Sequence, residues 1–278
     1  MRKPRMSDEP QIGEDGAALN KNHGTYLVPG LQRGLNVLEI VAAARKPLTV
    51  TEIADSLGVS RSSAFRLIYT LRYMGCLELS SDDRSYQLGA RVLNLGFAFL
   101  NTQSIIQVAR RDLEALRDAT NVSAHLAIRD GRDVLFLDCV QARTGFQSNV
   151  NVGARLGAHA SPLGWLLMSD IASRDIATLF KGATLEPLTD KTPVTLQALM
   201  EKVMLAATQG YIISRGFAEQ GGCSVSAPVF NKDGAIVAAI DISGPDSAFD
   251  HSKFEDFYKP EVIRAAGLIS ERLGYSGN

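Results

Sequence analysis

A short run of hydroxyl and guanidinium side chains could bind DNA. Residues 60–66 read SRSSAFR and bring together, with no acidic residue among them, Ser60, Arg61, Ser62, Ser63 and Arg66. An arginine side chain can donate to both O6 and N7 of one guanine, while serine hydroxyls and helix N-terminal amides suit phosphate oxygens. A solvated helix face with a serine cap would have the same composition. The surrounding elements must therefore decide between the two interpretations.

A second set of residues could act in catalysis: His125, His159, Cys223, Asp138 and Asp241. The chain has 4 histidines, which are far apart and match no metal-binding spacing, so we expect neither a metal ion nor a cofactor. The sequence lacks a Gly-x-Ser-x-Gly nucleophile motif. Cysteine at the start of an apolar run is more often a small buried side chain than a nucleophile. We therefore expect this half of the chain to bind a ligand, and an enzyme acting on a small organic acid is the alternative.

The segment before Ser60 predicts a helix-turn-helix. Residues 49–58 read TVTEIADSLG. We expect Thr51 to cap a helix whose first turn holds Glu52, and Gly58 to form the turn before the next helix. In this motif the second helix lies in the major groove with its N-terminal residues at the base edges. Three apolar residues of that helix are expected to pack inward: Phe65, Ile68 and Leu71.

The flanking segments predict a winged unit. Residues 31–48 predict a helix that ends near Pro47 and packs through one face, formed by Leu31, Leu35, Leu38, Val41 and Ala42. After Gly75, apolar runs at residues 76–79 and 86–88 flank a polar turn and predict a β-hairpin. The expected DNA contacts outside the second helix of the motif are Arg33, Thr51, Arg84 and Tyr86.

Residues 89–103 predict a helix that is apolar on most of its faces, and such a helix must be covered. We expect it to pack on its equivalent in a second subunit, and the alternative is that it packs on the core of its own chain. A two-fold symmetric dimer would bind double-stranded DNA at an inverted repeat.

Residues 104–278 predict a second domain. Helices are expected at 104–121, from Ser161-Pro162, from Thr195 to Gly210, and at 252–273. Strands are expected on both sides of a turn at Asp130-Gly131, at 144–153, and at 210–214, 223–230 and 235–243. The order of helix, strands, helices, strands and helix predicts an α+β fold.

Composition sets the limits of these interpretations. The chain has 278 residues, of which 45% are hydrophobic and 21% are charged, and its formal net charge is -1. These values indicate a globular protein of about two domains. The 3 cysteines are widely spaced and predict no disulfide framework. No apolar run reaches the ~18 residues of a membrane span, so we expect a cytoplasmic protein. Residues 1–24 are polar and lack periodicity, so we expect a disordered tail.

From about Tyr26 to Tyr275 the chain resembles the IclR family of bacterial transcription regulators. The resemblance is carried by stretches in the family's order: 31–40, 48–75, 86–96, 153–165, 210–214, 223–234 and 238–245. It implies a winged helix-turn-helix DNA-binding domain at 25–88, a linker and dimerisation helix at 89–103, and a GAF-like effector-binding domain at 104–278. It also implies a homodimer or homotetramer that controls a catabolic operon in response to a small acid. The alternative is a ligand-independent regulator whose second domain only oligomerises.

Two positions depart from the family pattern. The chain reads HASPLGW where the family has HATAxGK, so Trp165 stands in place of a lysine. The family also has an acidic residue about seven positions after its Gly-Tyr pair, where this chain has Phe217. Both changes remove charge and add aromatic surface. We therefore expect a more apolar effector pocket than is usual in the family.

The expected effector pocket has three parts. The helix that begins at Ser161-Pro162 leaves the amides of Leu163 and Gly164 free to bind an anion. The apolar lining is expected from Leu156, Leu163, Trp165 and Phe217. The polar groups are expected from the strands: His125, Ser224, Asp241 and Ser243. A carboxylate fits the helix start, whereas Asp241 would repel it and suit a hydroxyl. We therefore expect an aromatic acid, with or without a hydroxyl group, of benzoate to cinnamate size.

Overall fold

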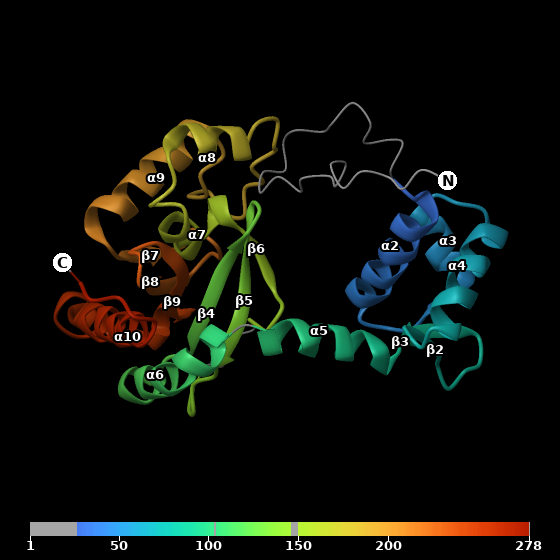
Figure 1. Ribbon diagram of the computed structural model, residues 1–278, viewed down its shortest axis with the longest axis horizontal. Coiled ribbons are helices and arrows are strands. Elements are labelled where there is room, and N and C mark those ends of the chain that lie inside the picture. The colour runs from blue at the N-terminus through green and yellow to red at the C-terminus, as the bar shows by residue number, and fades with distance from the viewer. Residues whose placement is uncertain (1–26, 103, 146–149, 278) are drawn as a thin grey trace, which may run out of the picture. The chain divides into compact units, whose positions relative to one another are not determined.

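The computed structural model describes residues 27–102, 104–145 and 150–277 (Figure 1). The chain divides into two compact units, and the boundary lies between Gln103 and Ser104. The expected N-terminal tail and part of the strand expected at 144–153 lie outside the described residues. No single helix in the described ranges is long and apolar enough to cross a membrane; the helices at Ala90–Leu100 and Ser104–Thr120 pass that test only as a pair with a bend of 84° between them.

The smaller unit is a winged helix-turn-helix, as the sequence predicts. Its elements in chain order are α2 (Pro29–Ala44), β1 (Leu48–Thr49), α3 (Val50–Leu57), α4 (Arg61–Tyr73), β2 (Leu77–Leu79), β3 (Ser85–Leu88) and α5 (Ala90–Thr102). Strands β2 and β3 form the expected hairpin. The two-residue strand β1 also pairs with β3 and makes the wing three-stranded, in the order β1-β3-β2. The sequence did not predict β1.

Helix α2 packs through a different face from the one that its leucines predict. The buried residues of α2 are Gly34, Val37 and Val41. Leu31 is 65% exposed and Leu35 is 53% exposed, so the prediction was wrong for both leucines. The face at Val37 and Val41 contacts the core that α2 shares with α3 and α4. The first two turns of α2 therefore keep apolar side chains in solvent.

Helix α4 also turns its apolar face differently from the prediction. Ala64, Ile68 and Leu71 are buried, whereas Phe65 is 50% exposed. Ala64 belongs to the same stripe as Ile68 at the spacing of four residues, and Phe65 lies one position, or about 100°, further around the helix. The exposed ring of Phe65 lies beside Tyr69, with 6.4 Å between the ring centroids.

The N-terminus of α3 is capped by Thr49 and not by Thr51. Thr49 Oγ1 accepts a hydrogen bond from the amide of Glu52 at 3.3 Å, and the amide of Thr49 donates to Glu52 Oε2 at 2.8 Å. These reciprocal bonds form a capping box. Hydrogen bonds lower the pKa of the Glu52 carboxyl to about 2. The backbone amide of Thr49 contributes most, followed by the Thr49 hydroxyl and the Lys46 ammonium. Thr51 is an exposed residue inside the first turn.

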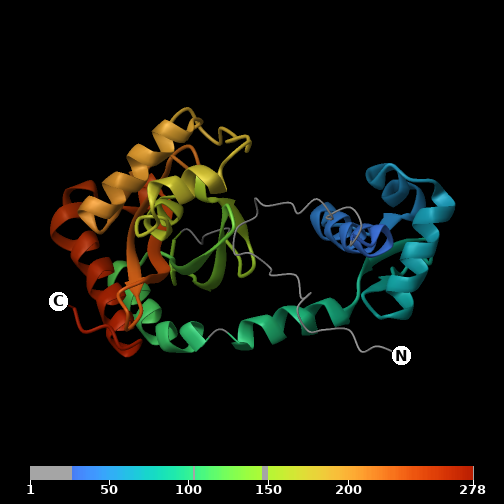
Figure 2. The ribbon, with the colours of Figure 1, turned by 45° about the horizontal axis from the view of Figure 1, so that its top comes forward.

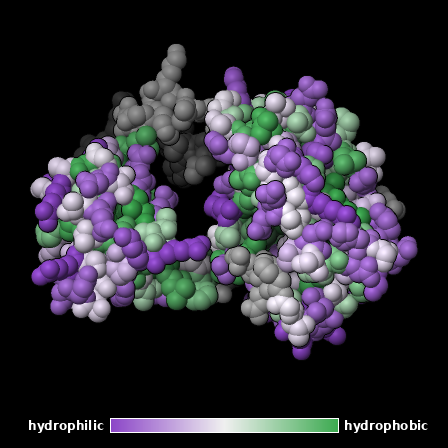
Figure 3. Space-filling view, turned by 180° about the vertical axis from the view of Figure 1, so that it is seen from behind, coloured by the Kyte–Doolittle hydropathy of each residue, from purple (hydrophilic) through white to green (hydrophobic). Residues whose placement is uncertain are grey.

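Helix α5 is apolar and uncovered within its own unit. Its large exposed side chains are Leu93, Leu95, Phe97 and Phe99. The space-filling view shows apolar surface gathered over this helix (Figure 3). No residue of α5 whose burial is described is fully buried. The helix therefore has the exposed apolar surface that the dimer prediction requires.

The larger unit contains one antiparallel sheet. Its helices are α6 (Ser104–Thr120), α7 (Pro162–Leu167), α8 (Ser173–Leu179), α9 (Leu196–Gln209) and α10 (Lys259–Arg272). Its strands are β4 (Ala124–Asp130), β5 (Asp133–Val140), β6 (Arg155–Gly157), β7 (Ile212–Arg215), β8 (Gly222–Phe230) and β9 (Ile236–Pro245). Short 3-10 turns span Ala158–Ala160, Asp246–Ala248 and His251–Lys253, and a π turn spans Phe254–Tyr258. The strand order β6-β5-β4-β9-β8-β7 confirms the α+β fold.

Helices cover both faces of this sheet. Helices α6 and α10 pack side by side on one face, and α7 packs on the other, under α9 (Figures 1 and 2). Helix α9 begins with Thr195 as its cap and ends at Gly210 with φ 69°, both as predicted. The third strand was predicted at 144–153, but the strand that pairs with β5 is β6, where Leu156 lies opposite Val134.

Candidate DNA-binding face and effector cavity

The exposed face of α4 begins with a serine cap. Ser60 Oγ accepts a hydrogen bond from the amide of Ser63 at 3.2 Å and donates to Ser63 Oγ at 3.0 Å. Ser62, Arg61 and Arg66 are exposed, and neither arginine forms an ion pair within the described residues. The two guanidinium groups are therefore free to meet an external partner, while Ser60 and Ser63 are partly committed to the cap.

Two tyrosines extend this face beyond the residues that the sequence predicts. Ala64, Ile68 and Leu71 are buried, so the opposite side of α4 faces solvent. Tyr69 and Tyr73 lie on that exposed side, in line with Ser62 and Arg66. Spacings of four, three and four residues from Ser62 place these side chains on one face of a helix. The sequence did not show that this face is exposed, because that depends on which residues of α4 are buried. We refer to the four residues Ser62, Arg66, Tyr69 and Tyr73 as the outer face of α4.

The other predicted DNA contacts are scattered over the winged unit. Arg33 on α2, Thr51 on α3 and Arg84 in the wing are exposed. Tyr86 is only 8% exposed and belongs to the core of the unit, opposite Leu48 and Leu79 in the sheet. Its side chain therefore supports the wing from inside and does not present a surface to DNA.

The tip of the wing is shaped by an acidic side chain. Asp82 Oδ1 accepts hydrogen bonds from the amides of Arg84 and Ser85 at 3.0 and 2.9 Å. These bonds lower the pKa of Asp82, and the bond from Arg84 contributes most. The Asp82 carboxylate fixes the backbone from which the exposed Arg84 side chain projects.

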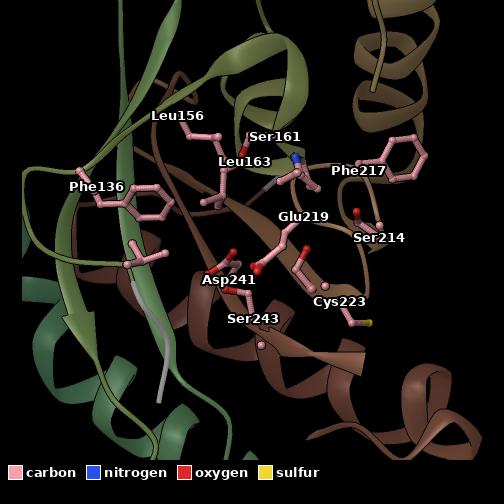
Figure 4. Close-up of a pocket in the computed structure, with 18 of the residues that line it drawn as sticks. Phe136, Leu156, Ser161, Leu163, Ser214, Phe217, Glu219, Cys223, Asp241 and Ser243 are labelled. Carbon is pink, nitrogen blue, oxygen red and sulfur yellow. The ribbon is translucent and has the colours of Figure 1, made fainter. Parts of the chain in front are cut away.

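A cavity of about 320 Å³ opens between α7, strands β8 and β9, and the loop that joins β7 to β8 (Figure 4). The predicted residues that line it are Leu156, Ser161, Pro162, Leu163, Phe217, Ser224, Asp241 and Ser243. The register explains part of this grouping, because Ser224 lies directly opposite Ser243 in neighbouring strands. Three predicted residues do not line the cavity: His125, Gly164 and Trp165.

Trp165 belongs to the core and not to the cavity wall. It is 1% exposed, and its indole nitrogen donates to the backbone oxygen of His159 at 2.8 Å. Its ring meets the ring of Phe217 edge-on at 5.1 Å. Figure 4 shows the Phe217 ring turned away from the centre of the cavity, while Phe136 points into it. The aromatic ring that points into the cavity is therefore that of Phe136, which the sequence did not indicate.

The start of α7 is a weaker anion site than the sequence suggested. Helix α7 has 6 residues, and Ser161 makes no side-chain capping bond. A helix of this length has a small dipole and few aligned amides. Gly164 serves packing, because a Cβ atom there would lie 2.2 Å from the backbone oxygen of Ala158. The close approach of α7 to the preceding turn is what requires glycine at this position.

A buried histidine holds the polar floor of the cavity. His125 Nδ1 donates to Asp241 Oδ1 at 2.8 Å, and Ser243 Oγ lies 3.2 Å from the same nitrogen. His125 is fully buried, lies opposite Asp241 across strands β4 and β9, and meets Phe136 edge-on. It orients the Asp241 carboxylate from behind as a hydrogen-bonded histidine of the core.

Glu219 is a cavity residue that the sequence did not single out. It lies in the loop between Gly216 (φ 73°) and Gly221 (φ 74°). Its carboxylate points into the cavity toward Asp241 and Ser243 (Figure 4). An acidic residue two positions after Phe217 was visible in the sequence, but only the path of the loop shows where it points. The expected loss of charge at Phe217 is thus offset by Glu219.

Hydrogen bonds from a neighbouring loop hold the Glu219 loop in place. Thr189 Oγ1 donates to the backbone oxygen of Gly216 at 2.7 Å, and Thr192 Oγ1 donates to that of Phe217 at 2.8 Å. The other end of the loop is closed where the amide of Gly222 donates to the backbone oxygen of Glu219 at 3.0 Å. These contacts bind backbone atoms and leave the Glu219 side chain free.

Arg155 is the basic residue that lines the cavity, and its charge is already paired. Its guanidinium forms salt bridges with Asp130 and with Asp133. The hydrogen bond that Arg155 donates to Asp130 is the largest of the contacts that raise the pKa of Arg155. Glu219 forms no salt bridge within the described residues, and Asp241 has only His125 as an ionic partner there. The cavity is therefore acidic.

Three of the catalytic candidates, His125, Asp241 and Cys223, lie at the cavity, and the other two, His159 and Asp138, are bonded elsewhere. Burial raises the pKa of the Cys223 thiol to about 11 and that of Cys139 to about 12, so both thiols are protonated at neutral pH and poor nucleophiles. His159 Nε2 bonds the backbone oxygen of Glu186 at 2.9 Å, and Asp138 pairs with Arg110. The described residues contain no group of three histidine, cysteine, aspartate or glutamate side chains placed to hold a metal ion.

Two family models match the chain. Residues 30–80 match the IclR helix-turn-helix domain, and residues 97–271 match the C-terminal domain of the bacterial transcriptional regulator IclR. The chain is similar to the HTH-type transcriptional regulator XynR of Escherichia coli (strain K12). The two sequences are 27% identical over 250 residues, which cover 90% of this chain and 98% of XynR.

Solved structures share the fold. A putative transcriptional regulator from Rhodococcus sp. RHA1 aligns with a TM-score of 0.76 at 25% identity, over 89% of this chain and 98% of its own. An IclR homologue from Microbacterium hydrocarbonoxydans, solved in complex with 4-hydroxybenzoate, aligns with a TM-score of 0.74 at 22% identity, over 88% and 98% of the two chains. Both alignments include the winged unit and the larger unit.

Proposed function

Because this chain belongs to the IclR family of bacterial transcriptional regulators, we propose that it binds a specific operator and controls transcription of a catabolic operon in response to a small effector. The DNA-binding part of the proposal rests on one observation, the outer face of α4 with Arg61 beside it. This surface presents unpaired guanidinium groups and hydroxyls, and none of its residues is acidic. Such a face suits a major groove, where arginine reads guanine and aromatic rings meet thymine methyl groups.

We propose that the DNA-bound form is a dimer. The support is α5, whose apolar side chains are exposed on several sides within its own unit. A second copy of α5 would remove that surface from water. Two winged units related by a two-fold axis would then read the two half-sites of an inverted repeat.

The effector is proposed to bind in the cavity beneath α7. The sequence predicts an aromatic acid there, and the 4-hydroxybenzoate of the Microbacterium homologue supports an aromatic effector. The apolar wall of Phe136, Leu156 and Leu163 supports the aromatic body, and Asp241 supports a hydroxyl donor. The acid group has less support, because α7 is short and the cavity already holds two carboxylates.

Fluorescence anisotropy at fixed salt tests the DNA-binding proposal. The operator is selected from a random pool of duplexes and compared with a scrambled duplex of equal length. We expect Arg66→Ala to weaken operator binding by about 1–3 kcal/mol, or roughly fivefold to 150-fold, if Arg66 reads a base. Arg111→Ala is the matched control, since Arg111 is an exposed arginine of α6 in the larger unit. Equal affinity of the wild type for both duplexes would refute the proposal.

A further inference from the structure

The cavity beneath α7 concentrates negative charge at one end. Asp241 is 5% exposed, and its Oδ1 is bonded to His125, whereas Oδ2 has no hydrogen-bond partner among the described residues. Glu219 approaches from the opposite loop and points toward Asp241 (Figure 4). A largely buried carboxylate that lines a cavity needs water, a ligand or a proton at the oxygen that the protein does not bond.

The charges around the cavity are not balanced by the protein. Arg155 is held by Asp130 and Asp133 and has no unpaired charge to offer. The ammonium of Lys202 lies over the rings of Phe217 and Trp165, at 4.7 and 5.7 Å from their centroids, and does not line the cavity. An anionic ligand would therefore meet repulsion at the end where Glu219 and Asp241 meet, and a cation would meet attraction.

The hydrogen-bonding groups at this end are mostly acceptors. Both carboxylates accept only, and the hydroxyls of Ser224 and Ser243 lie on the adjacent strands of the floor. A primary ammonium group has three donors and no acceptor, so it complements two carboxylates and one hydroxyl. The opposite wall is apolar, with Phe136, Leu156 and Leu163. The cavity thus fits a molecule with a cationic end and a flat or branched apolar body.

We propose that the effector is a small organic cation, in which a primary ammonium binds between Glu219 and Asp241 and the apolar body packs against Phe136 and Leu163. This inference rests on the proposed function, because it names the ligand class of the same effector cavity. It replaces the acid group of the sequence-based expectation with an amine and keeps the aromatic body.

Three probes of matched size separate the charge classes. They are 4-hydroxyphenethylamine, 4-hydroxyphenylacetate and 4-ethylphenol, which carry a cationic, an anionic and a neutral end on the same phenol. Calorimetric titration of the full chain at pH 7 should show the amine binding at least about tenfold tighter than the neutral phenol, since a partly buried ion pair is lost with the amine. The acid should bind weakest of the three.

Substitution of Glu219 tests the residue assignment. Glu219→Gln removes one carboxylate from an exposed position in the loop and should weaken the amine about tenfold with little effect on the phenol. Glu201→Gln on α9 is the matched control, because Glu201 is exposed and does not line the cavity. Glu219→Lys should reverse the order, so that the acid binds tighter than the amine. Asp241→Asn should likewise weaken binding of the amine. The thermal unfolding of this variant is measured in parallel, because His125 loses its ionic partner and the fold could be destabilised.

The outcomes distinguish this inference from the proposed function. Tighter binding of 4-hydroxyphenylacetate than of the amine, or an amine affinity unchanged by Glu219→Gln, would overturn the cation proposal while leaving an effector cavity in place. Absence of binding by all three probes at millimolar concentration would overturn it as well. Binding of the wild type to its operator is measured separately, without any probe. If the wild type does not bind the operator, the proposed regulatory function is refuted, and the proposed ligand class is not affected.

Discussion

The capping box of α3 predicts different effects on stability for substitutions of Thr49 and Thr51. Thr49→Ala removes the Oγ1 acceptor of the Glu52 amide and the hydroxyl that donates to Glu52 Oε2. Loss of a threonine cap costs about 1–2 kcal/mol. In a domain of this size each kcal/mol corresponds to roughly 4–8 °C in the melting temperature. Thr51→Ala removes an exposed side chain within the first turn, and it should change stability by less than about 0.5 kcal/mol.

The position of the single tryptophan makes the assay possible. The chain has 1 tryptophan, Trp165 in the larger unit, so its fluorescence does not report on the winged unit. Thermal unfolding followed by far-ultraviolet circular dichroism should show a transition that Thr49→Ala lowers and that tryptophan fluorescence does not follow. Destabilisation by Thr51→Ala equal to that by Thr49→Ala would refute the cap assignment.

The same box predicts how the winged unit responds to acid. The pKa of Glu52 is about 2 in the folded chain, below its ordinary value of 4.5. A folded-state pKa below the unfolded value means that the ionised carboxylate stabilises the fold. This contribution is complete above pH 4.5 and is lost as the pH falls toward 2. The difference in melting temperature between the wild type and Glu52→Gln should therefore shrink between pH 5 and 2, and a constant difference would contradict the assignment.

Three further predictions concern the wing, the linker helix and α7. Arg84→Ala should lower the slope of log affinity against log salt by about 0.9 if Arg84 contacts one phosphate, and an unchanged slope would place it off the DNA. Leu95→Lys in α5 should lower the sedimentation mass to that of a monomer, whereas Asn94→Lys should not if Asn94 lies outside the contact. Gly164→Ala should destabilise the larger unit by about 1–3 kcal/mol in urea titrations followed by tryptophan fluorescence, and no change would show that α7 can move away from Ala158.

Local signals in the sequence were sufficient for most of the element boundaries. Thr195 and Gly210 at the two ends of α9, and the turn at Asp130-Gly131, each need a residue type that satisfies a local backbone requirement. The sequence did not predict the correct residue where two similar side chains could both cap the same helix. Thr49 and Thr51 both suit a helix cap, and the one three residues before Glu52 makes the box.

Side-chain direction was the part that the sequence could not settle. Phe65 is the larger apolar residue, but the helix packs closely enough on α2 and α3 to take Ala64 instead. Trp165 lies in a helix beside the cavity, yet its ring turns into the core. Glu219 enters the cavity because two glycines with positive φ fold its loop back. These outcomes depend on contacts between segments far apart in the chain.

The attachment of the Glu219 loop has a consequence for how the charge of the cavity can change. Thr189 and Thr192 hold the loop by its backbone oxygens, and Phe217 packs against Trp165, so the course of the loop does not depend on the side chain of Glu219. A single substitution at Glu219 can therefore invert the charge offered to the ligand while the scaffold keeps its shape. Charge and folding are therefore separable properties at this position of the cavity wall.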